Sequence, residues 1–596
     1  MRKSKKVCCV IIRFKIICLL VLAFPYKNFS QNSHLSFQKG GEKTLIGDEK
    51  HSYNLSLKKG DFLQLHLQQK DVNLQVLALS SSKDTIQVFL DNYREDGLEI
   101  VEFPVKKSGM YTFKVSPYIS KWLKDSAREN FINSINGSYI VEKFNTFSPK
   151  EYKTLLKLRK AQKDSVINWI SDKSITLKGV KAETGFEDLS QLKPVLRNVK
   201  VVGMGETSHG AKEIFQMKHR MFEFLVKEMG FTLFGLEASY IGCKPINDYV
   251  LYGKGNSRDA LSAQGFWIWN VESIVDLIEW MHDYNKTVPE SKKVKFIGID
   301  TQTNGLDIAY RNISDFIGDS KDNPLLDINV DSLFHSIRTV KSKNDLSVQR
   351  QQLYRTLSYI IVNEIRLVNK SSKQEYLNVI SDLKKVIQGV EAGDLKLRDK
   401  VDYNIRDEFM AQTILEELNK KGQEAKMMIW AHNGHINKDP KSYTNGSQKP
   451  LGSILKQYLG DSKYYAIGFS TYQGSFQARS YIEKDSKYKY GKVGSFRIYP
   501  RDEENLDWYF LQSRKDRFFL DFKQKPKNGA INSFLNKNLD MHSAGSIWTF
   551  ERKYSPISEI IPDKYFDGMI FIKETSSAVL TPNGEIEIQN RIEKGK

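Results

Sequence analysis

The sequence predicts an α/β fold with a mainly parallel sheet, flanking helices and a helical insertion, preceded by an all-β sandwich domain. From Val199 onward, short apolar runs alternate with amphipathic helices, as in parallel sheets that are covered on both faces. Before residue 147, the apolar runs are short, alternating and separated by turns. Between about 306 and 420, a long, charged, helix-like stretch interrupts the strand–helix alternation.

The first 30 residues predict a secretory signal peptide. A basic segment from Arg2 to Lys15 precedes an apolar run from Ile16 to Phe24, and Ser30-Gln31 is the expected cleavage point. The run is too short for a comfortable membrane span, with an uncleaved anchor as the alternative. We therefore expect export to the periplasm or the extracellular space, with no stable membrane span after the signal is removed.

Removal of residues 1–30 changes the charge and the cysteine content. The segment carries seven Lys or Arg and no Asp or Glu, so the formal net charge of +19 falls to +12. The remaining positive charge is scattered and lacks aromatic interleaving, which disfavours nucleic-acid binding. Cys243 is then the single remaining cysteine, so an intrachain disulfide is excluded. A small buried residue is favoured over a nucleophile for Cys243.

Residues 31–146 predict the β-sandwich. The expected strands are Ser52–Leu57, Phe62–Leu67, Val72–Leu79, Thr85–Leu90, Glu99–Val105, Met110–Val115 and Tyr139–Phe144. The runs Leu57–Phe62 and Ser108–Tyr111 resemble the bacterial pre-peptidase C-terminal type of sandwich. No catalytic constellation lies here, so we expect an accessory module that binds a polymer or a surface.

Residues 150–596 predict the α/β domain, which begins with a helical stretch over 150–197. The expected strands are Val199–Met204, Phe231–Leu236, Val294–Ile299, Lys426–Trp430, Tyr464–Phe469 and Gly568–Ile572. The expected helices include Lys212–Met229 and Val271–Tyr284, and in the insertion at about 306–420 also Ser347–Val368, Glu375–Gly389 and Asp402–Asn419. The insertion is either a lid or cleft wall, or a stabilising subdomain.

Ionisable residues follow four of these strands at the point where each strand ends. Glu206 and His209 follow the first strand, Glu237 the second and Asp300 the third, while His432, Asn433 and His435 follow the fourth. Ligands of open α/β sheets bind beyond the carboxyl ends of the strands. Three of the ten histidines lie in these segments, and histidine exchanges protons near neutral pH. The pattern predicts a catalytic cleft at this edge.

Glu206 and His209 stand three residues apart in a glycine-rich turn, Gly205–Gly210. A carboxylate at this spacing holds one imidazole nitrogen and leaves the other free to take a proton from water. The alternatives are a helix-capping role for Glu206 and a structural role for His209.

Lys218 lies on the apolar stripe of the predicted helix Lys212–Met229, together with Ile214, Met221 and Leu225. A lysine at this position either extends its ammonium to solvent or meets an anion in the cleft.

The sequence lacks the motifs that mark several other classes of enzyme. The sequence contains no Gly-x-Ser-x-Gly nucleophile elbow, no His-Glu-x-x-His zinc helix and no Walker-type phosphate loop. The acids and histidines above are competent metal ligands, but their spacing matches no standard metal motif. We expect neither a metal nor another cofactor, with a metal-dependent hydrolase as an alternative.

Six segments resemble the erythromycin esterase family, in the family's order over about residues 185–575. They are Val202–Gly210, Phe234–Glu237, Phe296–Asp300, Asn404–Asp407, Ile429–His435 and Phe566–Met569. The resemblance implies hydrolysis of an ester, such as a macrolide lactone, by an activated water without a serine acyl-enzyme.

The resemblance also implies roles for single residues. His209 is the implied general base, and Glu206, Glu237, His432 and His435 complete the implied catalytic set. Lys218 stands where some members have arginine, which leaves substrate specificity open because the two side chains differ in hydrogen-bonding geometry. Lys218, Asp300 and Asn433 are the expected substrate-binding residues. The expected partner is a small-molecule ester, and the alternative to an enzyme is an exported binding protein with an inactive α/β domain.

Overall fold

The computed structural model describes residues 40–80, 85–90, 97–119, 125–302, 304–318, 328–339, 346–397, 403–442, 449–484, 487–500, 505–548 and 557–593. The signal peptide expected at residues 1–30 lies outside the described residues. The chain divides into two compact units, Met1–Lys160 and Ala161–Lys596.

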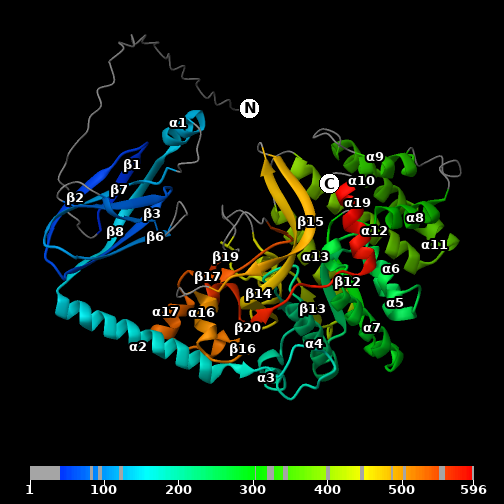
Figure 1. The fold of residues 1–596 in the computed structure, drawn as a ribbon. Helices are drawn as coiled ribbons and strands as arrows, with labels where there is room; N and C mark the ends of the chain where they lie inside the picture. The colour runs from blue at the N-terminus through cyan, green and yellow to red at the C-terminus, as the bar shows by residue number, and fades with distance from the viewer. Residues whose placement is uncertain are drawn as a thin grey trace, which may run out of the picture. The chain divides into compact units, whose positions relative to one another are not determined.

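The first unit contains two four-stranded antiparallel sheets (Figure 1). One sheet has the order β1 (Glu42–Ile46), β8 (Asn136–Phe147), β3 (Phe62–Lys70), β6 (Gly97–Pro104). The other has the order β2 (His51–Leu57), β7 (Gly109–Pro117), β4 (Leu74–Leu79), β5 (Thr85–Phe89). The helix α1 (Asp125–Ser134) precedes β8.

Alternating side chains build the core of this unit. Leu63, Leu65 and Leu67 of β3 are fully buried, as are Phe113 and Val115 of β7. This period of two is the pattern from which all seven strands were predicted, and all seven are confirmed. The strand β1 and the helix α1 were not predicted, and β1 begins with charged residues before a short apolar run.

The amino-terminal part of the long helix α2 (Pro149–Lys173) makes contacts in the first unit, and its carboxyl-terminal part lies in the interior of the second. In the first unit, Tyr152 stacks on Phe62 with ring centroids 4.0 Å apart, and Arg159 forms an ion pair with Glu102. In the second unit, Trp169 and Ile170 are buried in the core. The predicted helical stretch over 150–197 is wrong beyond Lys173, where turns, the short strand β9 (Ile175–Thr176) and the one-turn helix α3 (Leu192–Leu196) follow.

The second unit is built on a mixed sheet with the order β12-β11-β13-β10-β14-β20-β16-β9. The pairs from β12 to β20 are parallel, and β16 and β9 add antiparallel pairs at the far edge. The strands are β10 (Val201–Met204), β11 (Leu233–Ser239), β12 (Lys295–Asp300), β13 (Met427–Trp430), β14 (Tyr464–Lys484), β20 (Gly568–Thr575) and β16 (Arg517–Asp521). The predicted mainly parallel sheet is therefore confirmed.

The central strands are buried on both faces because alternate residues enter two separate cores. Val202 and Trp430 face one core, which is covered by α4 (Lys212–Met229) and α7 (Glu272–Lys286). Val201 and Ile429 face the other, which is covered by α13 (Tyr403–Lys421), α15 (Leu451–Leu459) and α16 (Leu506–Leu511). This double burial explains why the strands read as continuous apolar runs.

The helical insertion between β12 and β13 has its own apolar core, and Figure 1 shows its helices gathered beside the β12 edge. It contains α8 (Leu306–Ile317), α9 (Val330–Thr339), α10 (Leu346–Val362), α11 (Glu364–Lys370), α12 (Lys373–Leu397) and α13. The single helix predicted over Ser347–Val368 is two helices separated at Asn363. The Asn363 side-chain amide and its backbone N–H both donate to the Tyr359 carbonyl, so the side chain competes with the helix for this acceptor.

The remaining elements connect these layers. The helices are α5 (Lys244–Tyr252), α6 (Ser257–Ser262), α14 (Asn433–Ile436), α17 (Ala530–Leu535), α18 (Pro562–Tyr565) and α19 (Pro582–Glu593), with 3-10 turns at Trp267–Trp269, Glu290–Lys292 and Phe522–Gln524. The strands are β15 (Lys487–Ile498), β17 (Leu539–His542), β18 (Ile547–Trp548) and β19 (Ile557–Ile560). No helix in the described ranges has the length and apolarity needed to cross a bilayer.

Candidate active site

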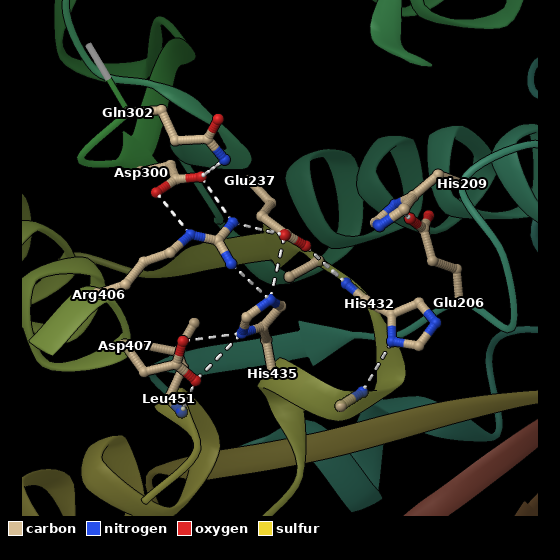
Figure 2. Close-up of polar contacts among 12 residues, drawn as sticks. Glu206, His209, Glu237, Asp300, Gln302, Arg406, Asp407, His432, His435 and Leu451 are labelled. Carbon is tan, nitrogen blue, oxygen red and sulfur yellow. Dashed lines mark hydrogen bonds and ion pairs between the residues drawn. The ribbon is translucent and has the colours of Figure 1, made fainter. Parts of the chain in front are cut away.

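The acids and histidines predicted at four strand ends come together in the second unit. Their strands β12, β11, β13 and β10 are consecutive neighbours in the sheet, so their carboxyl ends open on one edge. Figure 2 shows Glu206, His209, Glu237, Asp300, His432 and His435 converging there.

The first turn, after β10, packs directly against the turn after β13. A Cβ on Gly205 would lie 2.0 Å from Asn433 Oδ1, and a Cβ on Gly210 would lie 2.0 Å from the Gln477 carbonyl oxygen. A larger residue at position 205 would therefore separate the two turns, and one at position 210 would clash with the backbone of β14. The Asn433 N–H donates to the Glu206 carbonyl at 3.0 Å and completes this junction.

Glu206 is fully buried and is an acceptor for three side chains. One oxygen faces His209 Nδ1 at 2.6 Å, and the other accepts from Lys218 Nζ and Trp430 Nε1, each at 2.7 Å. The carboxylate does not cap a helix. Burial opposes its charged form, but Lys218 and His209 outweigh burial and lower the pKa of Glu206.

His209 has one nitrogen bound and one available. An ionised Glu206 only accepts, so Nδ1 carries the proton and Nε2 carries the lone pair. No described residue forms a hydrogen bond with Nε2, and the side chain is 13% exposed. The edge of the ring packs against Trp269, with centroids 5.5 Å apart. This is the arrangement that a general base requires.

Lys218 meets an anion rather than solvent, which settles the alternative left open by the sequence. Its ammonium is fully buried, pairs with Glu206 and lies 4.5 Å from the centroid of the Trp430 ring. Burial lowers the pKa of Lys218 to about 8, with Glu206 opposing the decrease.

Glu237 and Asp300 are joined by Arg406 from α13. Arg406 donates from Nε and one terminal nitrogen to the two oxygens of Asp300, at 3.0 and 2.7 Å. The same terminal nitrogen donates to Glu237 Oε1 at 2.9 Å. The other Glu237 oxygen accepts from the His432 backbone N–H at 2.9 Å. Burial raises the pKa of Glu237, but His435 and Arg406 hold it well below its ordinary value.

His435 is held between two carboxylates (Figure 2). Its Nδ1 lies 2.9 and 3.1 Å from the oxygens of Asp407, and its Nε2 lies 3.1 Å from Glu237 Oε1. Burial opposes the charge, but Asp407 and Glu237 raise the pKa of His435 to about 10. Nδ1 therefore donates to Asp407, and Nε2 faces both Glu237 and the Arg406 guanidinium, whose nearer terminal nitrogen lies 3.0 Å away.

The pKa of His432 is shifted in the direction opposite to that of His435, so its ring is neutral. Its Nδ1 accepts from the Gly434 N–H at 3.2 Å, so its Nε2 carries the proton and faces the Ala544 carbonyl at 3.2 Å. Burial, followed by His209, lowers the pKa of His432 to about 4. The ring lies beside His209 with centroids 5.3 Å apart.

The expected substrate-binding residues all have partners within the protein. Lys218 binds Glu206, Asp300 binds Arg406, and the Asn433 amide forms two hydrogen bonds with the Phe469 backbone, at 2.9 and 3.0 Å. Their visible role is to fix the walls of the site, and their role toward a substrate stays a prediction.

Arg406 and Asp407 were missed as site residues by the sequence analysis, as were Trp269, Trp430 and Ala544. The segment Asn404–Asp407 belonged to the family resemblance, which is the one signal that marked it. Arg406 and Asp407 reach the site from the helical insertion, and no local pattern shows that Arg406 contacts Glu237, which is 169 positions away. Asp407 also accepts from the Leu451 N–H at 2.8 Å.

Among the described residues, neither a cysteine nucleophile nor a metal-binding cluster is favoured. Cys243 is buried, and burial raises the pKa of its thiol, which disfavours a nucleophilic role. No three His, Cys, Asp or Glu side chains in the described ranges are arranged to hold a metal ion.

The family model of erythromycin esterase matches residues 226–575, more than half of the chain. The chain belongs to the erythromycin esterase family. Erythromycin esterase type II of Escherichia coli is 24% identical over 436 residues, which cover 68% of this chain and 97% of that protein. Glu237, Arg406, His432 and His435 lie within the matched stretch, and His209 precedes it. These similarities support a hydrolase.

Two solved structures share the fold of this family member. A protein from Bacillus cereus has a TM-score of 0.59 and 24% identity, and covers 70% of this chain and 99% of its own. A succinoglycan biosynthesis protein has a TM-score of 0.56, with the same identity and coverage. At this identity the likeness concerns the fold alone.

Proposed function

We propose that this protein is an exported ester hydrolase in which His209 activates the attacking water. The observation that carries the proposal is the pair of His209 nitrogens, one bound to a buried carboxylate and one without a partner. Among the three site histidines, His209 alone has a ring nitrogen with no hydrogen-bond partner among the described residues.

The proposed reaction uses His209 twice. Nε2 takes a proton from water while the water oxygen attacks the ester carbonyl carbon, and Glu206 stabilises the imidazolium that forms. The tetrahedral intermediate then collapses, the bond to the alkoxide breaks, and the Nε2 proton passes to the leaving oxygen. The products are an acid and an alcohol, and the histidine returns to its starting form.

His432 and His435 support the attack of water in different ways. Neutral His432 stands beside His209 and carries its proton on Nε2, so a small displacement of Ala544 would let it donate to the developing oxyanion. His435 has both nitrogens engaged, and therefore acts by fixing Glu237 rather than by touching the substrate.

The substrate class follows from the relatives by analogy. A relative named for erythromycin esterase activity makes a macrolide lactone the first candidate, which would make the protein an antibiotic-resistance factor. The β-sandwich is proposed as an accessory module for a polymer or a surface.

A turnover screen tests the proposal. The chain from Gln31 onward is assayed with erythromycin and with simple carboxylic esters, with and without a chelator. We expect hydrolysis of at least one ester that chelation leaves unchanged. Chelator-sensitive turnover would favour a metal-dependent hydrolase, and saturable binding without turnover would favour a binding protein. Amino-terminal sequencing of the exported protein checks removal of residues 1–30.

A further inference from the structure

The indole of Trp269 forms a wall beside the His209 ring. The two rings meet at an interplanar angle of 81°, with centroids 5.5 Å apart. The His432 ring is a second neighbour, with its centroid 5.3 Å from that of His209 (Figure 2). The hydrogen bond between Nδ1 and Glu206 fixes one atom of the imidazole, but it leaves the ring free to tilt about that contact. The neighbouring rings restrict this tilt, and with it the direction in which Nε2 points.

Trp269 is fully buried and is itself held in place. Its Nε1–H donates to the Glu237 backbone carbonyl at 2.9 Å. Its ring packs against Trp430 at an interplanar angle of 86°, with centroids 6.2 Å apart, and Trp430 in turn donates to Glu206. Trp269 therefore contacts residues on both sides of the site, those that hold Glu206 and the strand that carries Glu237.

The hydrogen bond to Glu237 lies at an irregularity of the sheet. β11 pairs with β13 as far as Leu236, and its pairing with β12 shifts register between Leu236 and Ser239. Bulges of this kind redirect side chains next to active sites. The indole N–H gives the Glu237 carbonyl a donor at this place. A phenylalanine would supply a ring but no N–H, so a tryptophan is needed to contact His209 and bind this carbonyl at the same time.

The turn that carries Trp269 is fastened to the segment around α19. The Asn270 side chain donates from Nδ2 to Glu587 of α19 at 2.7 Å. The Asn270 carbonyl accepts from the Thr581 N–H at 2.9 Å. These contacts fix the backbone directly after Trp269, so the indole is a rigid wall rather than an adaptable one.

We propose that Trp269 is a positioning residue that orients the His209 ring and joins it to the Glu237 side of the site. The inference rests on the proposed role of His209 as the general base. The indole exchanges no proton with the substrate. It keeps Nε2 directed at the attacking water, and its N–H fixes the backbone that carries Glu237. A misplacement of about 1 Å in a catalytic group can cost about 10²-fold in rate, so the contact should affect kcat rather than KM.

Turnover of Trp269→Phe tests this role, on the ester that the turnover screen identifies. The phenyl ring is smaller than the indole and lacks the N–H, so the imidazole gains room to tilt. We expect kcat to fall by about 10- to 100-fold, with little change in KM. The matched control is Trp280→Phe, which should keep the kcat of the unchanged protein. Trp280 is a buried tryptophan of the same core that packs on a histidine outside the site, His219, with centroids 5.8 Å apart.

A double variant separates positioning from a general loss of structure. If Trp269 acts through His209, adding Trp269→Phe to His209→Ala should lower kcat no further. Losses that multiply would overturn the inference alone, as would an unchanged kcat in Trp269→Phe. Turnover retained by His209→Ala would overturn the proposed general base, and the inference with it.

Proton NMR gives a readout that needs no substrate. The proton between His209 Nδ1 and Glu206 should give a downfield resonance, assigned by its loss in His209→Ala. We expect the resonance to broaden or disappear in Trp269→Phe, because a tilting ring exchanges this proton faster with water, and to persist in Trp280→Phe. An unchanged resonance in Trp269→Phe would overturn the inference.

A second change at position 269 covers the case in which Trp269→Phe does not fold. Benzothienylalanine has the shape of tryptophan without the N–H, so it fills the same space and removes only the hydrogen bond to Glu237. We expect it to lower kcat as well, by less than Trp269→Phe does. An unchanged kcat would show that the indole N–H does not join the two sides of the site.

Discussion

At the scale of single residues, the state of each site histidine is set by its partners rather than by its position in the sequence. His209, His432 and His435 face a carboxylate, a carbonyl and two carboxylates, respectively. The sequence identified all three, but it gave His432 and His435 no separate roles, because a local motif does not show which groups surround each ring.

The first prediction concerns His209. His209→Ala should lower kcat by about 10²–10⁴-fold, the usual contribution of a general base. Thermal stability should change little, because the ring is at the site surface. The matched control is His335→Ala, an exposed histidine on α9, which should keep normal kcat. A folded His209→Ala variant with near-normal turnover would remove His209 from the mechanism.

The second prediction separates orientation from stability at Glu206. Glu206→Gln should reduce turnover and also destabilise the fold by about 3–5 kcal/mol, because it leaves the Lys218 ammonium buried without its anion. Adding Lys218→Met removes that unpaired cation. We expect the double variant to regain most of the urea midpoint but not the turnover. If turnover returned with stability, Glu206 would have no role in orienting His209.

The third prediction is a pH dependence of stability caused by His435. Its folded pKa of about 10 exceeds the unfolded value of about 6.5. The folded state therefore keeps a proton that the unfolded state releases above pH about 6.5, and stability falls as the pH rises from there toward 10. Lys218 acts in the opposite direction above its folded pKa of about 8, so His435 is measured best below that pH.

The measurement is the urea midpoint between neutral pH and the folded pKa of Lys218, in the unchanged protein and in His435→Gln. The variant should be less stable but should lose the downward slope. Equal slopes in the two proteins would show that His435 does not hold the extra proton.

At the scale of elements, the strands that are buried on both faces of the sheet were the ones that could be predicted from the sequence. β10, β11, β12, β13 and β20 were predicted because each contains a continuous run of apolar, buried residues. The length of β14 was missed, since beyond Phe469 its residues alternate and pair with β15. The strand β16 was also missed, and it pairs antiparallel with β20 outside the strand–helix alternation.

The helix α13 shows why the site was only partly predictable. Its sequence predicts a helix, and its bounds, Tyr403–Lys421, agree closely with the expected Asp402–Asn419. Its function depends on neighbours far away in the sequence, because Arg406 joins Glu237 and Asp300 while Asp407 joins His435 and Leu451. The insertion therefore supplies one side of the polar network, rather than only covering the sheet.

At the scale of the whole molecule, the described catalytic groups all belong to the second unit. The interior of that unit includes the carboxyl-terminal part of α2, where Trp169 is 6% exposed and Ile170 is fully buried. The amino-terminal part of α2 makes its contacts within the first unit. The boundary for independent folding should therefore lie before Val166, not after α2.

The last prediction follows from this boundary. A chain that begins at Lys150 should fold and keep the kcat of the chain from Gln31, because it retains every described site residue and the buried part of α2. A chain that begins at Ile175 should unfold at a much lower urea concentration, since removing a buried side chain as large as Trp169 costs about 3–5 kcal/mol. Circular dichroism melts and turnover on one ester, measured for both chains, check this. A folded chain from Lys150 without turnover would show that the β-sandwich contributes to catalysis, and a stable chain from Ile175 would show that α2 is dispensable for the core.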